Sequence, residues 1–287
     1  MTIREAEQQT LLQLKKLYDD RESSNICDWV LEYLTDKRRI DRILFKDTVL
    51  SNKQLEQLGN IREQLGAGKP VQYVLNEAWF GGMKLFVNQF TLIPRPETEE
   101  LAEWIITESK DDPVGHLSIL DIGTGSGCIP VYLKKKMPGA VLSAIDTSEQ
   151  ALIVAKKNAE IHGVPIDFKQ LDFLKEPGWQ QLQTFDIIVS NPPYIRQSEE
   201  KTMAKNVLDH EPLLALFVPD NDALLFYRKI AAFGKTHLSE KGKIYLEINE
   251  ALGKDVLQLF EREGYYAELK KDLQGKDRMV KAWGRRP

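Results

Sequence analysis

The segment Ile119-Leu120-Asp121-Ile122-Gly123-Thr124-Gly125-Ser126-Gly127 decides the fold class of this chain. Its apolar first half is typical of a buried strand, and its glycines allow a tight turn and a close approach of a ligand to the backbone. The helix expected after the turn adds unpaired N–H groups and a partial positive charge. A strand, a glycine-rich turn and a helix in this order predict an α/β domain with a small-molecule site at the turn.

Short apolar strands alternate with helical stretches from His116 onward, which indicates a mostly parallel sheet. The expected strands span residues 118–122, 141–146, 166–168, 185–190, 243–248, 265–269 and 279–283, the last two pairing as a terminal antiparallel hairpin. The fold class is therefore predicted as α/β, with a Rossmann-like sheet of seven strands. This domain is expected to cover residues 98–287 and to begin with a helix from about Thr98 to Glu108.

The residues before this domain follow a different pattern. Residues 1–75 carry apolar side chains at helical spacing, and Ser51 with Gln54 has the form of a capping box. Short amphipathic helices bury their apolar faces against each other, so a small helical bundle is expected. From residue 72 to 91, aromatic and β-branched residues surround two glycines, which indicates a β-hairpin or extended linker. The domain prediction assigns residues 76–97 to this hairpin or linker.

Composition places the chain among soluble globular proteins. Its 287 residues are 42% hydrophobic and 29% charged, and the net charge of −4 gives no support to a nucleic-acid partner. Cys27 and Cys128 lie far apart, which fits a reducing cytoplasm. The histidines show no metal-ligand spacing, and no apolar run approaches membrane-spanning length. We expect a cytoplasmic monomer with no metal, no membrane partner and no direct nucleic-acid partner.

Acidic residues after neighbouring strands define the expected cofactor. Asp121, just before the glycine turn, would repel a pyrophosphate but suits a cationic amino-acid group, and Gly-x-Gly-x-Gly differs from the dinucleotide spacing. Asp146 ends the next strand, where a carboxylate accepts hydrogen bonds from both ribose hydroxyls, although alone it is as well explained as a helix-start acid. Asp172 and Phe173 can contact an adenine. A ligand that combines an adenosine, an amino-acid group and a positive charge is S-adenosylmethionine. The predicted cofactor-binding residues are Asp121, Gly123, Thr124, Gly125, Ser126, Gly127, Asp146, Asp172, Phe173 and Asn191.

The tetrapeptide Asn191-Pro192-Pro193-Tyr194 ends the apolar run 185–190 and forms a rigid corner. Proline restricts the residue before it to extended geometry, so the Asn191 side-chain carbonyl and the Pro192 carbonyl can each accept one N–H of a planar –NH₂ group. Tyr194 can stack on that group. In isolation, a strand followed by a proline-rich turn is the better explanation of this sequence. Beside the cofactor site it predicts methyl transfer to nitrogen, with Asn191, Pro192 and Tyr194 as catalytic residues and the whole tetrapeptide binding the substrate.

The expected chemistry consists mostly of positioning. An amide nitrogen is a poor nucleophile because its lone pair is delocalised into the carbonyl. Two acceptors orient the –NH₂ group and direct its out-of-plane electron density at the methyl group, and good alignment contributes about 7–11 kcal/mol. Both hydrogen bonds strengthen as positive charge moves onto the nitrogen, which stabilises the transition state selectively. No dedicated base is expected.

These motifs resemble the release factor glutamine N5-methyltransferases (the HemK/PrmC family) over nearly the full chain. The resemblance rests on segments 70–73, 93–99, 121–127, 190–195, 211–212, 215–216, 246–248 and 277–278. It implies a class I S-adenosylmethionine-dependent methyltransferase fold, S-adenosylhomocysteine as product, and methylation of the glutamine in the Gly-Gly-Gln motif of class 1 peptide chain release factors. It also implies that the amino-terminal bundle docks the release factor. Asn76 and Phe173 stand where the family commonly has glycine and tryptophan.

Arg95, between Pro94 and Pro96, has two interpretations. As a substrate-binding residue it would brace the substrate, or it would pair with Glu97 or Glu99. It is equally well explained as a surface arginine on a stiff linker between domains.

Two other functions stay open from the sequence. An adenine-N6 nucleic-acid methyltransferase shares the Asn-Pro-Pro-Tyr motif, but it needs a basic surface that separates strands, which this chain does not show. A protein that binds S-adenosylmethionine without turnover would need only the cofactor site. The intact tetrapeptide argues against that second alternative.

Overall fold

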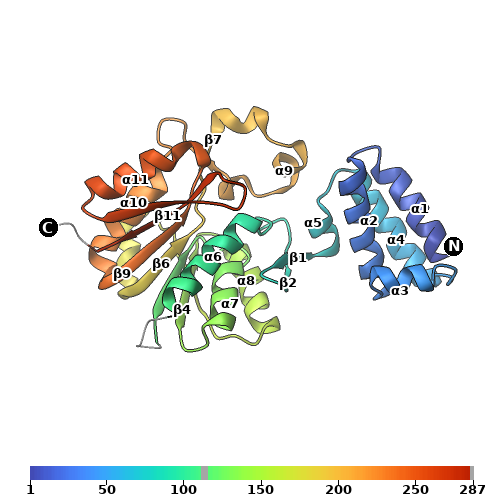
Figure 1. Cartoon of the computed structure of the whole chain (residues 1–287), viewed down its shortest axis with the longest axis horizontal. Coiled ribbons are helices and arrows are strands. Elements are labelled where there is room, and N and C mark those ends of the chain that lie inside the picture. The colour runs from blue at the N-terminus through green and yellow to red at the C-terminus, as the bar shows by residue number, and fades with distance from the viewer. Residues whose placement is uncertain (111–115, 285–287) are drawn as a thin grey trace. The chain divides into compact units, whose positions relative to one another are not determined.

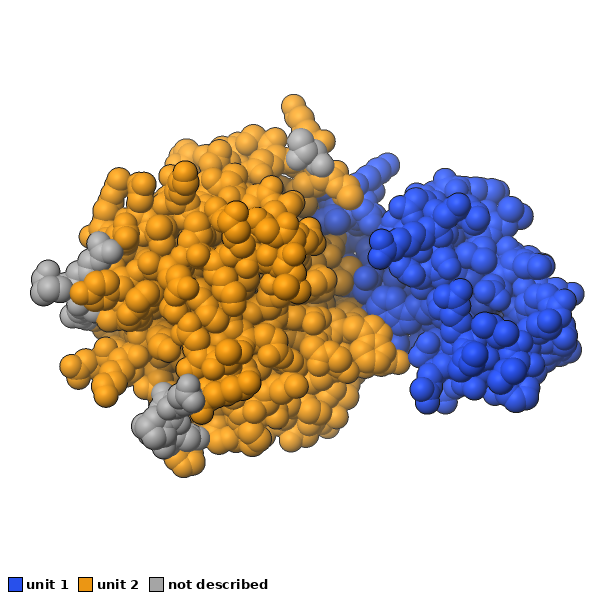
Figure 2. All heavy atoms as spheres, viewed as in Figure 1, with its two compact units in different colours: residues 1–77, 205–210 blue, residues 78–204, 211–287 orange. Residues whose placement is uncertain are grey.

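The computed structural model describes residues 1–110 and 116–284; residues 111–115 and 285–287 of the predicted α/β domain lie outside the described residues. The described chain forms two compact units, which Figure 2 colours separately. The first contains residues 1–77 and 205–210, and the second contains residues 78–204 and 211–287. The segment 205–210 thus belongs to the helical unit, although it lies far away in the sequence.

The first unit is a bundle of helices around a small apolar core. Its helices are α1 (Ile3–Leu14), α2 (Asp20–Thr35), α3 (Arg39–Leu44), α4 (Asn52–Gly66), α5 (Val71–Leu75) and α9 (Lys205–His210). The predicted capping box opens α4: the Gln54 N–H donates to Ser51 Oγ over 3.3 Å, and the Ser51 N–H donates to Gln54 Oε1 over 3.0 Å. Leu31, Leu58 and Leu65 lie in the core. The expected helical packing is confirmed.

Residues 72–76 do not form the extended segment that their aromatic and β-branched character indicated. Tyr73 and Val74 lie in the short helix α5, because Val71 and Leu75 become buried against the bundle when the chain is helical. Asn76 ends this helix in the left-handed conformation, with φ of 54°. Asparagine is one of the few residues besides glycine that adopt this conformation at a helix end. This geometry accounts for the departure from the family's usual glycine.

The predicted hairpin follows α5. Its strands β1 (Glu77–Phe80) and β2 (Met83–Phe86) form a two-stranded sheet around Gly81 and Gly82. Gly81 has a positive φ of 55°, and a Cβ atom there would overlap the ring of Tyr132. Only glycine fits this turn without strain.

The second unit contains the expected seven-stranded sheet. Its strands are β3 (Ser118–Ile122), β4 (Val141–Asp146), β5 (Asp167–Gln170), β6 (Phe185–Ser190), β9 (Leu238–Glu247), β10 (Tyr266–Lys271) and β11 (Asp277–Trp283). Their order is β10-β11-β9-β6-β3-β4-β5, and β11 runs antiparallel to both of its neighbours. Strand β9 begins at Leu238, before the expected residue 243, because its first residues pair with β6 although Glu240 and Lys241 are exposed and give no apolar signal.

Helices cover both faces of this sheet (Figure 1). Helices α6 (Pro96–Ser109), α7 (Cys128–Lys136) and α8 (Glu149–Ile161) pack on one face, and α10 (Leu225–His237) and α11 (Gly253–Arg262) pack on the other. In β6, Ile187 and Val189 belong to the apolar core under α6, α7 and α8, and Ile188 belongs to the core under α10 and α11. Burial on both faces explains why the strands read as continuous apolar runs.

Short elements complete the connections of the second unit. They are the strands β7 (Ile195–Arg196) and β8 (Phe217–Val218), which pair in parallel, and the 3₁₀ helices η1 (Glu176–Gln181), η2 (Gln197–Thr202), η3 (Leu213–Ala215) and η4 (Glu250–Leu252). Within residues 1–110 and 116–284, no helix combines the length and apolar character needed to cross a bilayer.

Candidate active site

The predicted site residues gather at the carboxyl edge of the sheet, where the strand order reverses. Strands β4 and β5 lie on one side of β3, whereas β6 and β9 lie on the other. The last residue of β3, Ile122, pairs with the last residue of β6, Ser190. The glycine turn and the Asn191 corner therefore begin at neighbouring points, at the kind of switch point where open α/β sheets bind ligands.

Asp121 is a buried carboxylate without a partner. The residue is 1% exposed, and neither carboxylate oxygen accepts a hydrogen bond from the described protein. Burial raises the pKa of Asp121 to about 7; the nearby Thr124 hydroxyl opposes this shift, and the charge of Asp146 adds to it. A buried acceptor without a hydrogen bond is costly and calls for an explanation. A cationic amino group is the ligand that this carboxylate fits.

Asp146 connects the glycine turn to the next helix. Its carboxylate accepts the Gly125 N–H at 2.9 Å and the Ser148 N–H at 2.9 Å, and burial raises its pKa. The N-cap of α8 is Ser148, whose hydroxyl accepts the Ala151 N–H at 3.2 Å. Asp146 is therefore not the helix cap, and each of its oxygens retains acceptor capacity for a hydroxyl group.

The glycine turn is held from behind by α8. Gly123, Gly125 and Gly127 have φ values of 75°, 55° and 76°. A Cβ atom on Gly127 would lie 3.0 Å from the Cβ of Ala155. The fully buried Asn158 donates to the Ser126 carbonyl at 2.9 Å and bonds both the N–H and the C=O of Phe86. Asn158 was not among the predicted site residues, although a polar residue on the buried face of a helix is a signal for such a role.

Asp172 and Phe173, after β5, have different environments. The Asp172 side chain is partly exposed and pairs with Lys175 at 3.2 Å. Phe173 is only 5% exposed, and its ring stacks on Trp179 and meets the edge of Phe233. The ring of Phe173 thus packs within the core, with Trp179 against one of its faces, and its predicted contact with an adenine stays a prediction. Asp172 remains accessible.

A hydrogen-bonded chain orients the side chain of Asn191. The Asn191 Nδ2 group donates to Thr98 Oγ1 at 3.0 Å, and the Thr98 hydroxyl donates to Glu247 Oε2 at 2.6 Å. The Tyr194 hydroxyl donates to the other oxygen of Glu247 at 3.1 Å. Thr98 and Glu247 lie within the motif segments 93–99 and 246–248, but no role was predicted for either residue. An acid that ends an otherwise apolar strand was the available signal.

Glu247 lies at the end of β9, next to the end of β6, and is 1% exposed. Burial raises its pKa to about 7, although hydrogen bonds from Thr98 and Tyr194 oppose the shift. Tyr194 also packs against the core, and burial raises its pKa. Both polar side chains of the corner, the Asn191 amide and the Tyr194 phenol, are thus connected to one buried carboxyl group.

Arg95 pairs with Glu211, and not with Glu97 or Glu99 as its position suggested. The guanidinium group lies 2.6 Å from Glu211 Oε1, and Glu211 Oε2 accepts the Ile93 N–H at 3.2 Å. The Glu211 side chain is 1% exposed and the Arg95 side chain 34% exposed. Proline on both sides of Arg95 favours extended backbone, which directs the side chain away from the first turn of α6. Arg95 therefore fastens segment 93–96 to the loop at 211.

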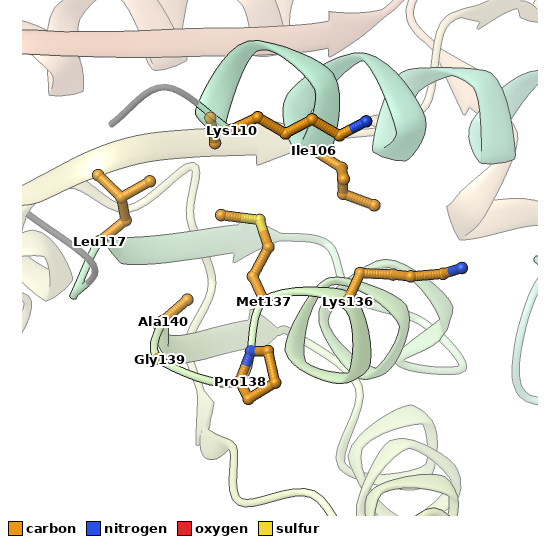
Figure 3. A pocket seen from close by; sticks show the side chains of 9 residues that line it. Ile106, Lys110, Leu117, Lys136, Met137, Pro138, Gly139 and Ala140 are labelled. Carbon is orange, nitrogen blue, oxygen red and sulfur yellow. The ribbon is translucent and has the colours of Figure 1, made fainter. Parts of the chain in front are cut away.

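A surface cavity of about 280 Å³ lies elsewhere (Figure 3). It is lined by Leu117, just before β3, and by Met137 to Ala140, just before β4, so it lies at the amino edge of the sheet. It contains none of the predicted site residues. The described residues also contain no group of three or more histidines, cysteines and acids that could hold a metal ion.

Comparison with known proteins assigns the chain to a family. Residues 5–75 match the PrmC N-terminal domain, and residues 106–212 match the Methyltransferase small domain. The chain is 47% identical over 283 residues to the release factor glutamine methyltransferase of Flavobacterium psychrophilum, covering 98% of this chain and 99% of that relative. This chain belongs to the release factor glutamine methyltransferase family. The family member from Bacteroides thetaiotaomicron is 44% identical over 244 residues, which are 85% of this chain and 86% of that one.

The expected enzyme class, a protein-glutamine methyltransferase, is confirmed by these family members. The structure of the hMettl16 catalytic domain, in complex with an RNA hairpin of the MAT2A 3′UTR, is similar in fold, with a TM-score of 0.51 at 14% identity over 82% of each chain. At this identity the likeness concerns the fold alone. Of the three functions that the sequence left open, the comparisons support the protein-glutamine methyltransferase.

Proposed function

We propose that this chain transfers a methyl group from S-adenosylmethionine to the side-chain amide nitrogen (N5) of the glutamine in the Gly-Gly-Gln motif of class 1 peptide chain release factors. The observation that carries the proposal is the orientation of Asn191. Its –NH₂ group donates to Thr98 and therefore lies on the Thr98 side, which leaves its carbonyl oxygen on the other side to accept an N–H of the substrate amide.

The residues after β3, β4 and β5 would hold the cofactor. The unpartnered carboxylate of Asp121 suits the amino group of the methionine moiety, and the Asp146 carboxylate suits the ribose hydroxyls. The backbone of residues 123–127 would lie against the ligand, and Asp172 is the accessible acceptor after β5. Phe173 would contribute by shaping the floor of the site. When bound, S-adenosylmethionine supplies an electrophilic methyl group beside the corner.

The corner would bind and orient the glutamine amide. The Asn191 and Pro192 carbonyl oxygens would each accept one N–H, with Pro193 fixing the backbone and Tyr194 covering the plane of the amide. These acceptors interact more strongly as the nitrogen becomes positive, so they stabilise the transition state more than the bound substrate. Arg95 would act on this site indirectly, by fixing segment 93–96 through Glu211.

The bundle over residues 1–75 would dock the release factor. The apolar side chains Ile40, Ile43, Leu44 and Phe45 of α3 and the residue after it are exposed, although most large apolar side chains of such a unit belong in its core. An exposed group of this kind suits a protein partner. We further propose that the protein acts in the cytoplasm, since Cys27 and Cys128 are both unpaired and the proposed substrate functions in translation. That it acts there as a monomer stays a prediction.

The test of the proposal is incubation of the full chain with S-adenosylmethionine and an unmethylated release factor, followed by peptide mass spectrometry. We expect the mass of one methylene group to be added once, on the glutamine of the Gly-Gly-Gln motif. Methylation of DNA or RNA without methylation of the release factor would contradict the proposal. So would cofactor binding, measured by calorimetry, without methylation of the release factor.

A further inference from the structure

We propose that Thr98 and Glu247 are positioning residues that determine which way round the side-chain amide of Asn191 lies in the site. The inference deepens the proposed function and rests on it, because it concerns how the acceptor for the substrate amide is presented. Neither residue needs to touch the substrate. Both act through the hydrogen bonds that end at Asn191 Nδ2.

The direction of each hydrogen bond follows from the chemistry of the groups. An ionised carboxylate only accepts hydrogen bonds, whereas a threonine hydroxyl has a single hydrogen to donate. That hydrogen is committed to Glu247 Oε2 at 2.6 Å, a length typical of a bond to a charged acceptor. Thr98 Oγ1 can then only accept from Asn191, and the –NH₂ end of the amide meets this requirement.

The opposite orientation of Asn191 would be unfavourable on both sides. Its carbonyl oxygen would face the lone pairs of Thr98 Oγ1, which has no second hydrogen to donate. Its –NH₂ group would face the –NH₂ group of the substrate, so two donors would oppose each other. Glu247 therefore determines the chemical identity of the group that meets the glutamine amide.

Glu247 is suited to this role by its surroundings. It belongs to β9, whereas Thr98 belongs to α6 and Asn191 follows β6, so the chain of hydrogen bonds joins separate elements. Glu247 also accepts the Tyr194 hydroxyl, which couples the aromatic side of the corner to the same carboxylate. The other charged or titratable groups that face Glu247 are Glu97 of α6, Cys128 of α7, Tyr227 of α10 and Arg278 of β11. Arg278 favours the ionised carboxylate, and Glu97 disfavours it.

Four variants test the inference: Thr98→Val, Thr98→Ser, Glu247→Gln and the double variant T98V/E247Q. Thr98→Val removes the hydroxyl group at nearly constant volume. Glu247→Gln introduces an –NH₂ group that can donate to Thr98 and so reverse the direction of the hydrogen bonds. We expect T98V and E247Q each to lower kcat on the order of 10²-fold, with little change in KM for the release factor. T98S keeps the hydroxyl and should stay close to the wild type. The double variant should be no worse than T98V, because Glu247 acts on Asn191 through Thr98, and the carbonyl oxygen of a glutamine can still accept the Tyr194 hydroxyl.

The pH profile separates orientation from packing. A protonated Glu247 can donate to Thr98, so kcat of the wild type should fall as the pH drops through about 7, the pKa to which burial raises Glu247. In E247Q, kcat should not show this fall near pH 7, because a glutamine does not titrate. Unchanged kcat in T98V and E247Q would overturn the inference. So would a T98S variant as impaired as T98V, because the effect would then come from packing.

Two controls complete the experiment. Glu108→Gln changes an acid at the other end of α6 that bonds Lys243, Lys281 and Tyr245, and it should leave kcat unchanged. If E108Q lowered kcat as much as T98V and E247Q do, then any loosening of α6 would be enough to cause the loss, and the inference would be contradicted. The side-chain –NH₂ signal of Asn191 in NMR should exchange slowly in the wild type and faster in T98V. This readout tests the positioning role even if the wild type methylates no release factor, in which case only the proposed function fails.

Discussion

The Ser190 hydroxyl donates a 2.7 Å hydrogen bond to the carbonyl oxygen of Ile122. Each of these residues ends its strand, and the two are separated by 68 positions in the sequence. The bond locks the starting point of the Asn191 corner to the starting point of the glycine turn. A methyl donor held by the turn and an amide held by the corner would thereby meet with little freedom to misalign, which is what a reaction dominated by positioning requires.

Asn191→Ala should abolish most turnover and leave cofactor binding largely intact. The variant removes one of the acceptors for the substrate amide, and loss of a single oriented group of this type lowers kcat about 10²–10³-fold. Single-turnover methylation and calorimetry with S-adenosylmethionine measure the two effects. The control is Gln183→Ala, an exposed amide just before β6 at the amino edge, which should remain active. A fully active N191A protein would contradict the assignment.

Asp121→Asn should weaken cofactor binding and yet stabilise the cofactor-free protein at neutral and higher pH. The folded-state pKa of Asp121 is raised to about 7, so between the unfolded pKa and this value only the unfolded chain releases its proton. The contribution of Asp121 to the free energy of unfolding is therefore fully present below the pKa of the unfolded chain and is lost as the pH rises through about 7. We expect D121N to be more stable than the wild type on the order of 1–3 kcal/mol near pH 8, a difference that shrinks toward pH 4.

Thermal unfolding at several pH values, with and without S-adenosylmethionine, measures both effects of D121N. Loss of one charge-assisted interaction should weaken the affinity about 10–100-fold. Asp186→Asn is the matched control, because Asp186 lies at the amino edge and its carboxylate accepts bonds from Ser118 and Ser239. This control should lose stability and keep its affinity. An unchanged affinity in D121N would remove Asp121 from the cofactor site.

Arg95→Ala and Glu211→Gln distinguish the two interpretations of Arg95. If Arg95 only fastens segment 93–96, R95A leaves the buried Glu211 carboxylate without its ion partner. We then expect the free energy of unfolding to fall by about 1–3 kcal/mol, which is less than for a fully buried pair because Arg95 is partly exposed. E211Q should then change kcat and KM in the same direction as R95A. Chemical denaturation and steady-state kinetics provide the comparison. A raised KM in R95A alone would instead indicate direct contact of Arg95 with the release factor.

The double variant Ile43→Asp/Leu44→Asp tests docking by the bundle. Both side chains are exposed on α3, so the substitutions should leave the fold intact. If this surface contacts the release factor, KM for the intact factor should rise about 10-fold or more, the usual effect of losing an apolar anchor. Methylation of a short Gly-Gly-Gln peptide should not change. Ile153→Asp, an exposed isoleucine on α8, is the control, and equal KM values for both variants would contradict docking at α3.

The sequence predicted the sheet better than it predicted the contacts of the site. Apolar runs and the glycine turn identified the strands because burial on both faces leaves a local pattern. Strand β9 began earlier than expected and α5 was missed, since pairing with β6 and packing in the bundle determined those residues. The partner of Arg95 was wrong for a similar reason: Glu211 is 116 positions away, and no local rule connects the two.

By itself, the sequence determined the α/β fold, the glycine turn with its preceding acid, and the Asn-Pro-Pro-Tyr corner. These features depend on short-range chemistry: positive φ angles, proline geometry and continuous runs of apolar side chains. The tertiary structure alone decided that Asn191, Thr98, Glu247 and Tyr194 form one hydrogen-bonded group and that the Phe173 ring is packed in the core. Such contacts join separate strands and helices, and the order of strands in the sheet brings those elements together.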